Sequence, residues 1–259
     1  MTSHLPLLLA NGQLALWYGF LVFLRVGSVV MVLPAFGEQT VPVRVKLAVG
    51  LCFTMIVAAA MPIENLPADR LMTSFIPYLV AEPVNGLILG IGFRLFVMAL
   101  QMAGVIAAQA LSLSQILGGA GVDPMPAVGQ VLLVAGLALA TMSGLHVQVA
   151  EALILSYDAL PAGQLPVPSD LARWGLDQIA HSTALAFSLA APFLIISVLY
   201  NLTLGVINRA MPQLMVTFIG APAITLVGLI LLLLFVPLML AVWIRALQVF
   251  ATNPFSASL

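Results

Sequence analysis

Long hydrophobic runs occupy most of this 259-residue chain, and they restrict its fold more than any other feature. A membrane-spanning helix needs about 20 mostly apolar residues. Stretches of alternating polarity, as in a membrane β-barrel, are absent from the sequence. We therefore predict an all-α, polytopic membrane protein of about six long, kinked helices that form helical hairpins. The candidate segments are Leu14–Phe36, Val43–Met61, Phe75–Leu117, Ala127–Tyr157, Gln178–Ile207 and Leu214–Leu247.

The composition excludes several other classes of protein. Hydrophobic residues make up 63% of the chain and charged residues only 7%, whereas a soluble domain carries about 25% charged residues. The net charge of −1 argues against nucleic-acid binding, which needs a dense basic face. The single cysteine, Cys52, excludes an internal disulfide framework. We predict that Cys52 is a small buried hydrophobic residue.

Two of the segments are too long for one straight crossing. Phe75–Leu117 is 43 residues long, about 65 Å as a helix, and its prolines predict a kink or a split. Leu214–Leu247 contains the sequence Gly-Ala-Pro. We expect a break or hinge there, at Gly220 and Pro222.

The proline-rich stretch Ala159–Asp170 is the best candidate for a linker. It divides the chain into an N-terminal portion, residues 1–160, and a C-terminal portion, residues 171–259. Six crossings would place three basic residues on each side of the membrane, so the positive-inside rule predicts no orientation. Either the segments are wrong, or insertion in the bilayer does not arrange this chain.

Few residues are suited to catalysis or metal binding. The sequence contains no His-Glu-x-x-His motif and no phosphate-binding glycine loop. Ser143 and His146 faintly resemble an intramembrane serine hydrolase, but no third orienting group is evident. We predict no enzyme activity, no metal and no cofactor.

Ionisable side chains lie within the apolar segments, where facing lipid costs each several kcal/mol. They are expected to point into protein or water. Buried ion pairs or anchors between helices are favoured over a transport path, because no run resembles a proton relay. These residues are Arg25, Glu82, Arg94, Glu151 and Arg209.

The stretch Gln109–Met125, QALSLSQILGGAGVDPM, interrupts the apolar pattern. Its three glycines disfavour a helix by about 1 kcal/mol each, and the proline after Asp123 requires an extended or turn conformation. Non-helical backbone at membrane depth persists only when it is buried in protein or lines a water-filled cavity. A gate loop and an ordinary surface loop both fit this pattern.

Three parts of the chain resemble one family. Phe23–Lys46 combines an arginine in the first helix with a Pro-x-Phe-Gly-Glu turn and a Val-Pro-x-Arg-Val start to the next helix. Gly90–Phe93, Gln109 and the Val-Asp-Pro at 122–124 match the middle of the family, and Gly205–Gly228 is the most specific part. In order, these features resemble the FliR family of flagellar biosynthetic proteins, over residues 14 to 247. The segment that follows the Asp-Pro pair is shorter here than in the family.

The resemblance implies a subunit of the flagellar type III export gate in the inner membrane, at the flagellar basal body. FliP and FliQ would be its partners, FlhB would associate with them, and unfolded rod, hook and filament proteins would be exported. Residues 1–160 would resemble FliP and residues 171–259 a FliQ-like hairpin. A plug at about 111–125 would close the pore, and it would contain Leu111, Leu113, Ser114, Ile116, Leu117, Gly118, Gly119, Gly121, Asp123 and Met125.

The resemblance also implies contacts between helices and subunits. Arg25, Glu82 and Arg94 are expected to make such contacts in the N-terminal portion, and the C-terminal hairpin would use Asn208, Arg209, Pro212 and Gln213. Two alternatives remain. One is a small-solute secondary transporter with a midplane site near Arg94, and the other is an intramembrane enzyme that uses Ser143 and His146.

Overall fold

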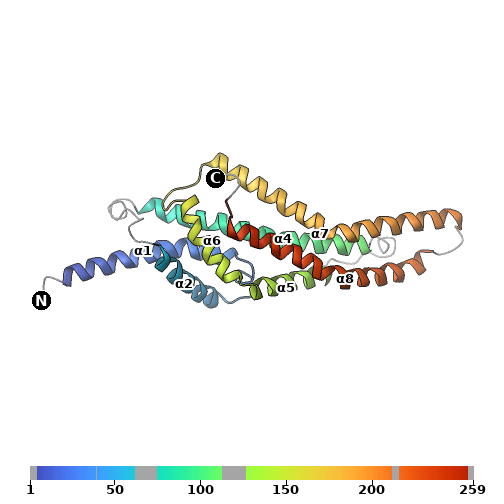
Figure 1. Ribbon diagram of the computed structural model, residues 1–259, viewed down its shortest axis with the longest axis horizontal. Helices are drawn as coiled ribbons and strands as arrows, with labels where there is room; N and C mark the ends of the chain where they lie inside the picture. The colour runs from blue at the N-terminus through green and yellow to red at the C-terminus, as the bar shows by residue number, and fades with distance from the viewer. Residues whose placement is uncertain (1–4, 39, 62–74, 113–126, 212–215, 256–259) are drawn as a thin grey trace. The chain divides into compact units, whose positions relative to one another are not determined.

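The computed structural model describes residues 5–38, 40–61, 75–112, 127–211 and 216–255. All regular structure in these ranges is α-helical, which confirms the predicted fold class (Figure 1). The helices are α1 (Leu5–Val32), α2 (Val43–Ala60), α4 (Ile76–Ser112), α5 (Ala127–Met142), α6 (Leu145–Ala159), α7 (Pro168–Ala210) and α8 (Val216–Thr252).

Five of these helices are long and apolar enough to cross a membrane. The count rises to six if α5 and α6 form one bent span. Long apolar helices therefore carry the fold, as the sequence predicts. The predicted limits are less accurate than the predicted helices, because an apolar pattern misses polar helix ends.

The sequence predicts a kink or a split in Phe75–Leu117, and within the described residues of this segment, 75–112, the structure shows no split. Within this segment α4 is one helix of 37 residues with Pro83 inside it. Proline removes only one amide donor, and a long helix can keep its remaining backbone bonds on either side. Helix α7 likewise contains Pro192 and starts at Pro168, ten residues before the predicted Gln178, since proline suits the first helical position.

The predicted segment Ala127–Tyr157 is two helices. Gly144 adopts a left-handed conformation with φ of 83°, which glycine reaches without steric cost. The helix breaks there, so that α5 ends at Met142 and α6 begins at Leu145. The sequence did not predict this break, because a single glycine inside an apolar run does not indicate which backbone angle it adopts.

The predicted break at Gly220 and Pro222 does not end a helix. The backbone of both residues belongs to α8, while their side chains lie outside the described part of the structure. The connection between α7 and α8 instead falls at 211–215. Whether Gly220 and Pro222 form a hinge remains a prediction.

The described residues pack into two compact units. The first unit takes its residues from Met1–Arg94, Ser143–Gln178 and Gln248–Leu259, and the second from Leu95–Met142 and Ile179–Leu247. This grouping is by packing. The FliP-like and FliQ-like division at residues 160 and 171 rests on resemblance and remains a prediction.

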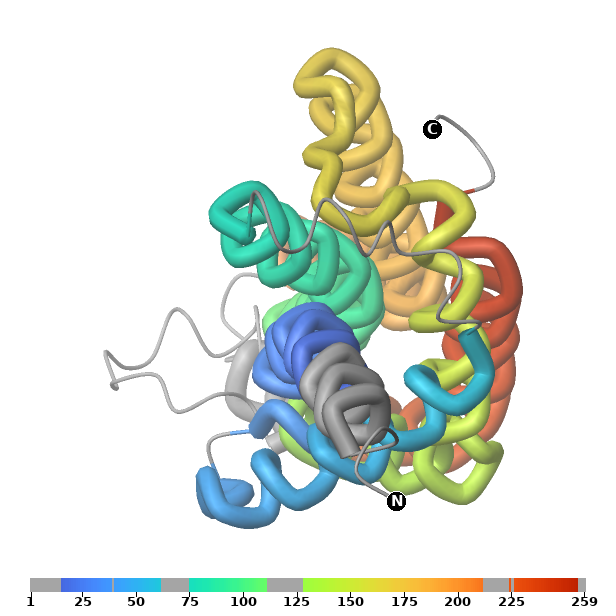
Figure 2. Tube along the Cα trace, turned by 90° about the vertical axis from the view of Figure 1, so that its left-hand side faces the viewer, coloured from blue at the N-terminus to red at the C-terminus, as the bar shows by residue number. Residues whose placement is uncertain are grey.

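In the first unit, α1 packs against α2 and against the first half of α4, as seen for the blue and teal helices of Figure 2. Two glycines of α4 permit the close approach to α1. A Cβ atom on Gly86 would overlap the Ser28 hydroxyl and the carbonyl of Arg25, and one on Gly90 would lie 3.3 Å from the Val29 Cα. The two helix backbones therefore nearly touch along this seam.

In the second unit, α4 and α5 meet through glycine. A Cβ atom on Gly104 would overlap the Cα of Gly129. The buried indole of Trp243 on α8 donates a 2.8 Å hydrogen bond to the carbonyl of Phe96 on α4. Its ring also lies against the position of Gly136 on α5. One aromatic side chain thus joins three helices.

Large apolar side chains remain exposed along several helices. Within Leu226–Thr252 of α8, only 22% of an apolar 18-residue window is buried, and α2 is buried to the same extent. Cys52 of α2 is exposed as well, so the prediction of a buried cysteine is wrong. It lies on an apolar helix face that no other described part of the chain covers.

Candidate functional site

Arg25, in the middle of α1, makes several polar contacts among the described residues of the first unit. It is fully buried, beside Val22 and Val26 on the same helix. Its Nε donates a 2.7 Å hydrogen bond to Glu82 Oε2, and its Nη2 lies 3.3 Å from Glu82 Oε1. Glu82, on α4, is also buried. The pair joins α1 to α4.

Arg25 also reaches α6. Its Nη1 donates to Ser156 Oγ at 3.2 Å, and its Nη2 donates to the carbonyl of Leu160 at 2.9 Å. The ring of Tyr157 lies over the guanidinium, with its centroid 3.7 Å from Cζ. A planar group with five donors suits such a site, because it bonds in several directions within one plane.

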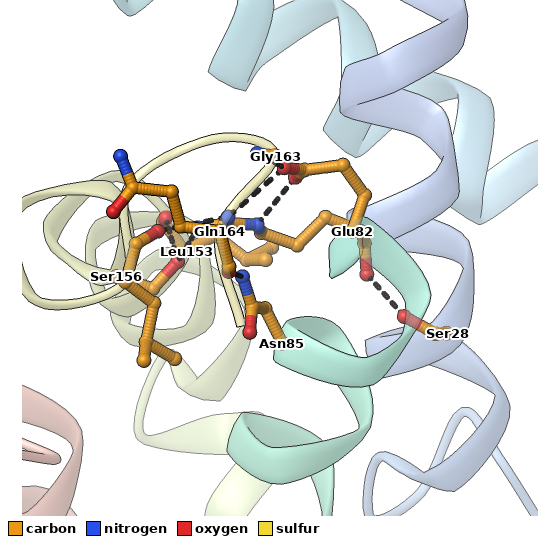
Figure 3. Close-up of polar contacts among 9 residues, drawn as sticks. Ser28, Glu82, Asn85, Leu153, Ser156, Gly163 and Gln164 are labelled. Carbon is orange, nitrogen blue, oxygen red and sulfur yellow. Dashed lines mark hydrogen bonds and ion pairs between the residues drawn. The ribbon is translucent and has the colours of Figure 1, made fainter. Parts of the chain in front are cut away.

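Two side chains of α4 bind the backbone of the connection between α6 and α7. Glu82 Oε1 accepts a 2.9 Å hydrogen bond from the Gly163 amide, and Asn85 Nδ2 donates one of 2.9 Å to the Gln164 carbonyl. Glu82 and Asn85 are three residues apart, so they share a face of the helix. Figure 3 shows both reaching toward the connection.

We call this group the Arg25 cluster: Arg25, Glu82, Asn85, Ser156 and the backbone of Leu160, Gly163 and Gln164. Removing one partner of a buried ion pair costs about 3–5 kcal/mol, because the other charge stays buried and uncompensated. The cluster is not fully satisfied. Within the described part of the structure, Asn85 Oδ1 is buried and has no hydrogen-bond partner.

Arg94 lies outside this cluster. Its Nη1 lies 2.5 Å from Glu38 Oε1, and the two side chains are 32% and 24% exposed. Asn208 and Arg209 are exposed at the end of α7, whereas Pro212 and Gln213 lie outside the described residues. Glu151 is exposed on α6.

Most of the predicted plug lies outside the described residues. Leu111 belongs to the last turn of α4, and its side chain is not described. Leu113, Ser114, Ile116, Leu117, Gly118, Gly119, Gly121, Asp123 and Met125 fall within 113–126, which the structure does not describe. Of the hydrolase candidates, Ser143 directly precedes the break at Gly144, and His146 is exposed at the start of α6.

Sequence reasoning missed several members of the cluster. Asn85 follows Glu82 by three residues on one helix, which could have indicated a shared partner. The sequence does not indicate that Ser156 belongs to the cluster. It also does not show which backbone groups lack helical partners, so the contributions of Leu160, Gly163 and Gln164 could not be predicted.

The fold and this cluster define a class: a polytopic α-helical membrane protein whose N-terminal helices are joined through buried ionic contacts. The family model described as "Bacterial export proteins, family 1" matches residues 16–249. The chain therefore belongs to this family.

Similar proteins named "Flagellar biosynthetic protein FliR" occur in several bacteria. The chain is 31% identical to that of Caulobacter vibrioides, over 86% of this chain and 90% of the relative. It is 29% identical to that of Escherichia coli (85% and 84%) and 29% identical to that of Aquifex aeolicus (84% and 84%). These matches support the FliR assignment and make the chain a membrane subunit of the flagellar export apparatus.

Proposed function

We propose that this chain is a non-enzymatic core subunit of the export gate. It helps to form the pore through which unfolded rod, hook and filament proteins pass, in the inner membrane at the flagellar basal body. FliP and FliQ form the pore with it, and FlhB associates with them. Membership of the export family supports this proposal.

The observation that carries the proposal is the uncovered apolar surface. Five helices are long and apolar enough to span a membrane, yet in each of them less than half of an apolar 18-residue window is buried within the chain. Contiguous exposed apolar surface marks contact with lipid or with other proteins. A subunit of a helical ring would cover such surface with its neighbours.

The segment at 111–125 closes the resting pore in this proposal. The helices that flank it, α4 and α5, approach each other at Gly104 and Gly129 so closely that a Cβ atom on Gly104 would overlap the Gly129 backbone. This contact supports the proposal because it gives a closing segment a firm base on both sides.

Deleting Ser114–Gly121 tests the plug. The complex should still assemble, while the membrane becomes permeable to small ions. As a matched control, a deletion of eight residues from the connection at 62–70 should not produce a leak. An assembled complex with unchanged permeability would contradict the plug assignment.

Purification tests the partners. The chain should be recovered from its native membrane in mild detergent together with FliP and FliQ, which mass spectrometry would identify. Recovery as a lone monomer would count heavily against the proposal.

The transporter alternative needs a free polar site near Arg94. In the structure this guanidinium is paired with the Glu38 carboxylate, so the geometry does not favour that site. Uptake of a small solute by the chain alone in liposomes would revive the alternative.

A further inference from the structure

The connection between α6 and α7, residues 160–167, has the composition of a flexible linker but is held by side chains. Three of its backbone polar groups are bound from other helices. The Leu160 carbonyl accepts from Arg25, the Gly163 amide donates to Glu82, and the Gln164 carbonyl accepts from Asn85. All three side chains are buried.

We propose that Arg25, Glu82 and Asn85 are positioning residues that lock this connection in one conformation, and that the lock is required for incorporation into the export apparatus. The requirement for incorporation rests on the proposed function. The lock itself does not, since it concerns contacts within one chain.

The connection cannot hold this conformation by itself. Pro161 and Pro166 have no amide hydrogen to donate. Its backbone bonds lie mainly at its two ends. The Leu160 amide bonds to Ser156 and the Val167 carbonyl accepts from Asp170 and Leu171, while between them the Gln164 amide lies 3.2 Å from the Pro161 carbonyl. Leu160 is buried, and a buried backbone carbonyl needs a partner. Arg25 of α1 supplies that partner, while Glu82 and Asn85 of α4 bind the half-buried Gly163 and the exposed Gln164.

Gly163 makes the fit specific. Its φ of 73° lies in the left-handed region, and a Cβ atom there would lie 2.6 Å from the ring of Tyr78. Tyr78 is itself buried. Gly163 therefore leaves no room for a side chain beside the Tyr78 ring, while its amide donates to the Glu82 carboxylate.

The start of α7 is held from a second direction. The Trp174 indole, which is buried, donates a 2.9 Å hydrogen bond to the Pro254 carbonyl, and its ring contacts Phe255. The first turns of α7 are thus fixed by the connection before them and by the residues after α8. If the connection moved, α7 would move with it, and the contacts of Trp174 with Pro254 and Phe255 would be disturbed.

Stability alone does not account for the cluster. Replacing a buried ion pair by apolar residues of similar volume is often neutral or stabilising. The Arg25 cluster also leaves the Asn85 Oδ1 atom buried without a partner in the described structure. Apolar side chains in place of Arg25 and Glu82 could preserve stability, but they would not hold the connection in one conformation.

This distinction gives the test. Glu82→Met in the full-length chain leaves Arg25 buried and unpaired, so the unfolding temperature in detergent should fall. The double variant Arg25→Met, Glu82→Met should recover most of that loss, because both charges are gone. Hydrogen exchange at the amides of 162–165 should nevertheless be about ten- to a hundredfold faster than in the unaltered chain, as expected when charge-assisted anchors are lost.

The pair Arg94 and Glu38 provides the matched control. It has the same residue types but is partly exposed. The double replacement of this pair by methionine should leave exchange at 162–165 unchanged. Asn85→Leu supplies a second variant: it keeps the ion pair and removes only the bond to Gln164, so exchange should rise by a smaller factor.

Each outcome separates the lock from the proposed function. If the double variant recovers its unfolding temperature and keeps its amides protected, the lock is overturned. If the connection opens but the variant still co-purifies with FliP and FliQ and still supports secretion, the requirement for incorporation is overturned. If the unaltered chain does not co-purify with them, the proposed function fails, while the exchange result still decides the lock.

Discussion

Gly86 of α4 lies directly against α1, and replacing it by alanine tests that contact. The new methyl group would overlap the Ser28 hydroxyl and the Arg25 carbonyl oxygen. The hydroxyl is tied down, because it donates a 2.8 Å hydrogen bond to that same carbonyl. The carbonyl is helix backbone and cannot rotate away, so α1 and α4 must separate.

The magnitude follows from three effects. Overpacking a close interface costs about 1–3 kcal/mol. Separation also stretches the 2.7 Å bond between Arg25 and Glu82, one turn before Gly86, and a hydrogen bond to a charged group contributes about 1.5–3 kcal/mol. Alanine returns about 1 kcal/mol through its helix propensity. We expect the free energy of unfolding to fall by about 2–4 kcal/mol.

Thermal unfolding of the purified chain in detergent measures this loss, which corresponds to a drop in unfolding temperature of about 5–15 °C. Gly19→Ala and Gly175→Ala are the controls, because a Cβ atom at either position meets nothing within 4 Å. Both should raise stability by about 0.5–1 kcal/mol. If Gly86→Ala were as stable as these controls, the close approach of α1 and α4 would be refuted.

Three further predictions concern single side chains. Trp243→Phe should lower the free energy of unfolding by about 1 kcal/mol in chemical denaturation, since the bond to the Phe96 carbonyl is lost; an unchanged value would show that this bond is not made. Arg94→Ala should change it by less than about 1 kcal/mol, because the partner Glu38 can be hydrated, and a loss of several kcal/mol would contradict that exposure. Cys52, exposed on α2, should react with a maleimide at the rate of a free thiol in the detergent-solubilised chain, measured by mass shift; lack of reaction would contradict its exposure.

The helices could be predicted because bilayer thickness imposes a length on apolar segments. The ends of the helices could not be predicted, because a first turn that is not apolar is not detected by a search for apolar segments. Pro168 and Asp170 belong to the first turn of α7, yet the proline-rich pattern predicts a linker over both. The break at Gly144 depends on a backbone angle, and glycine permits such an angle without requiring it.

The candidate site was only half visible in the sequence. Arg25 and Glu82 stand out as ionisable residues in apolar segments, where burial with a partner is the usual solution. Ser156 lies 131 positions from Arg25, and no periodic pattern connects residues so far apart. The backbone of Leu160 and Gly163 completes the site, and the residue types do not indicate which backbone atoms bind side chains.

The residues of the Arg25 cluster are synthesised at widely different times. The carbonyl of Leu160 is made 135 residues after Arg25. At about 5–20 residues per second, the Leu160 carbonyl is made about 7–27 s after Arg25, although Glu82 follows Arg25 by only 57 residues. The first helices therefore stay incompletely joined while the ribosome makes the middle of the chain. A pause in translation before residue 160 would prolong that state, when the growing chain is most open to quality-control proteases.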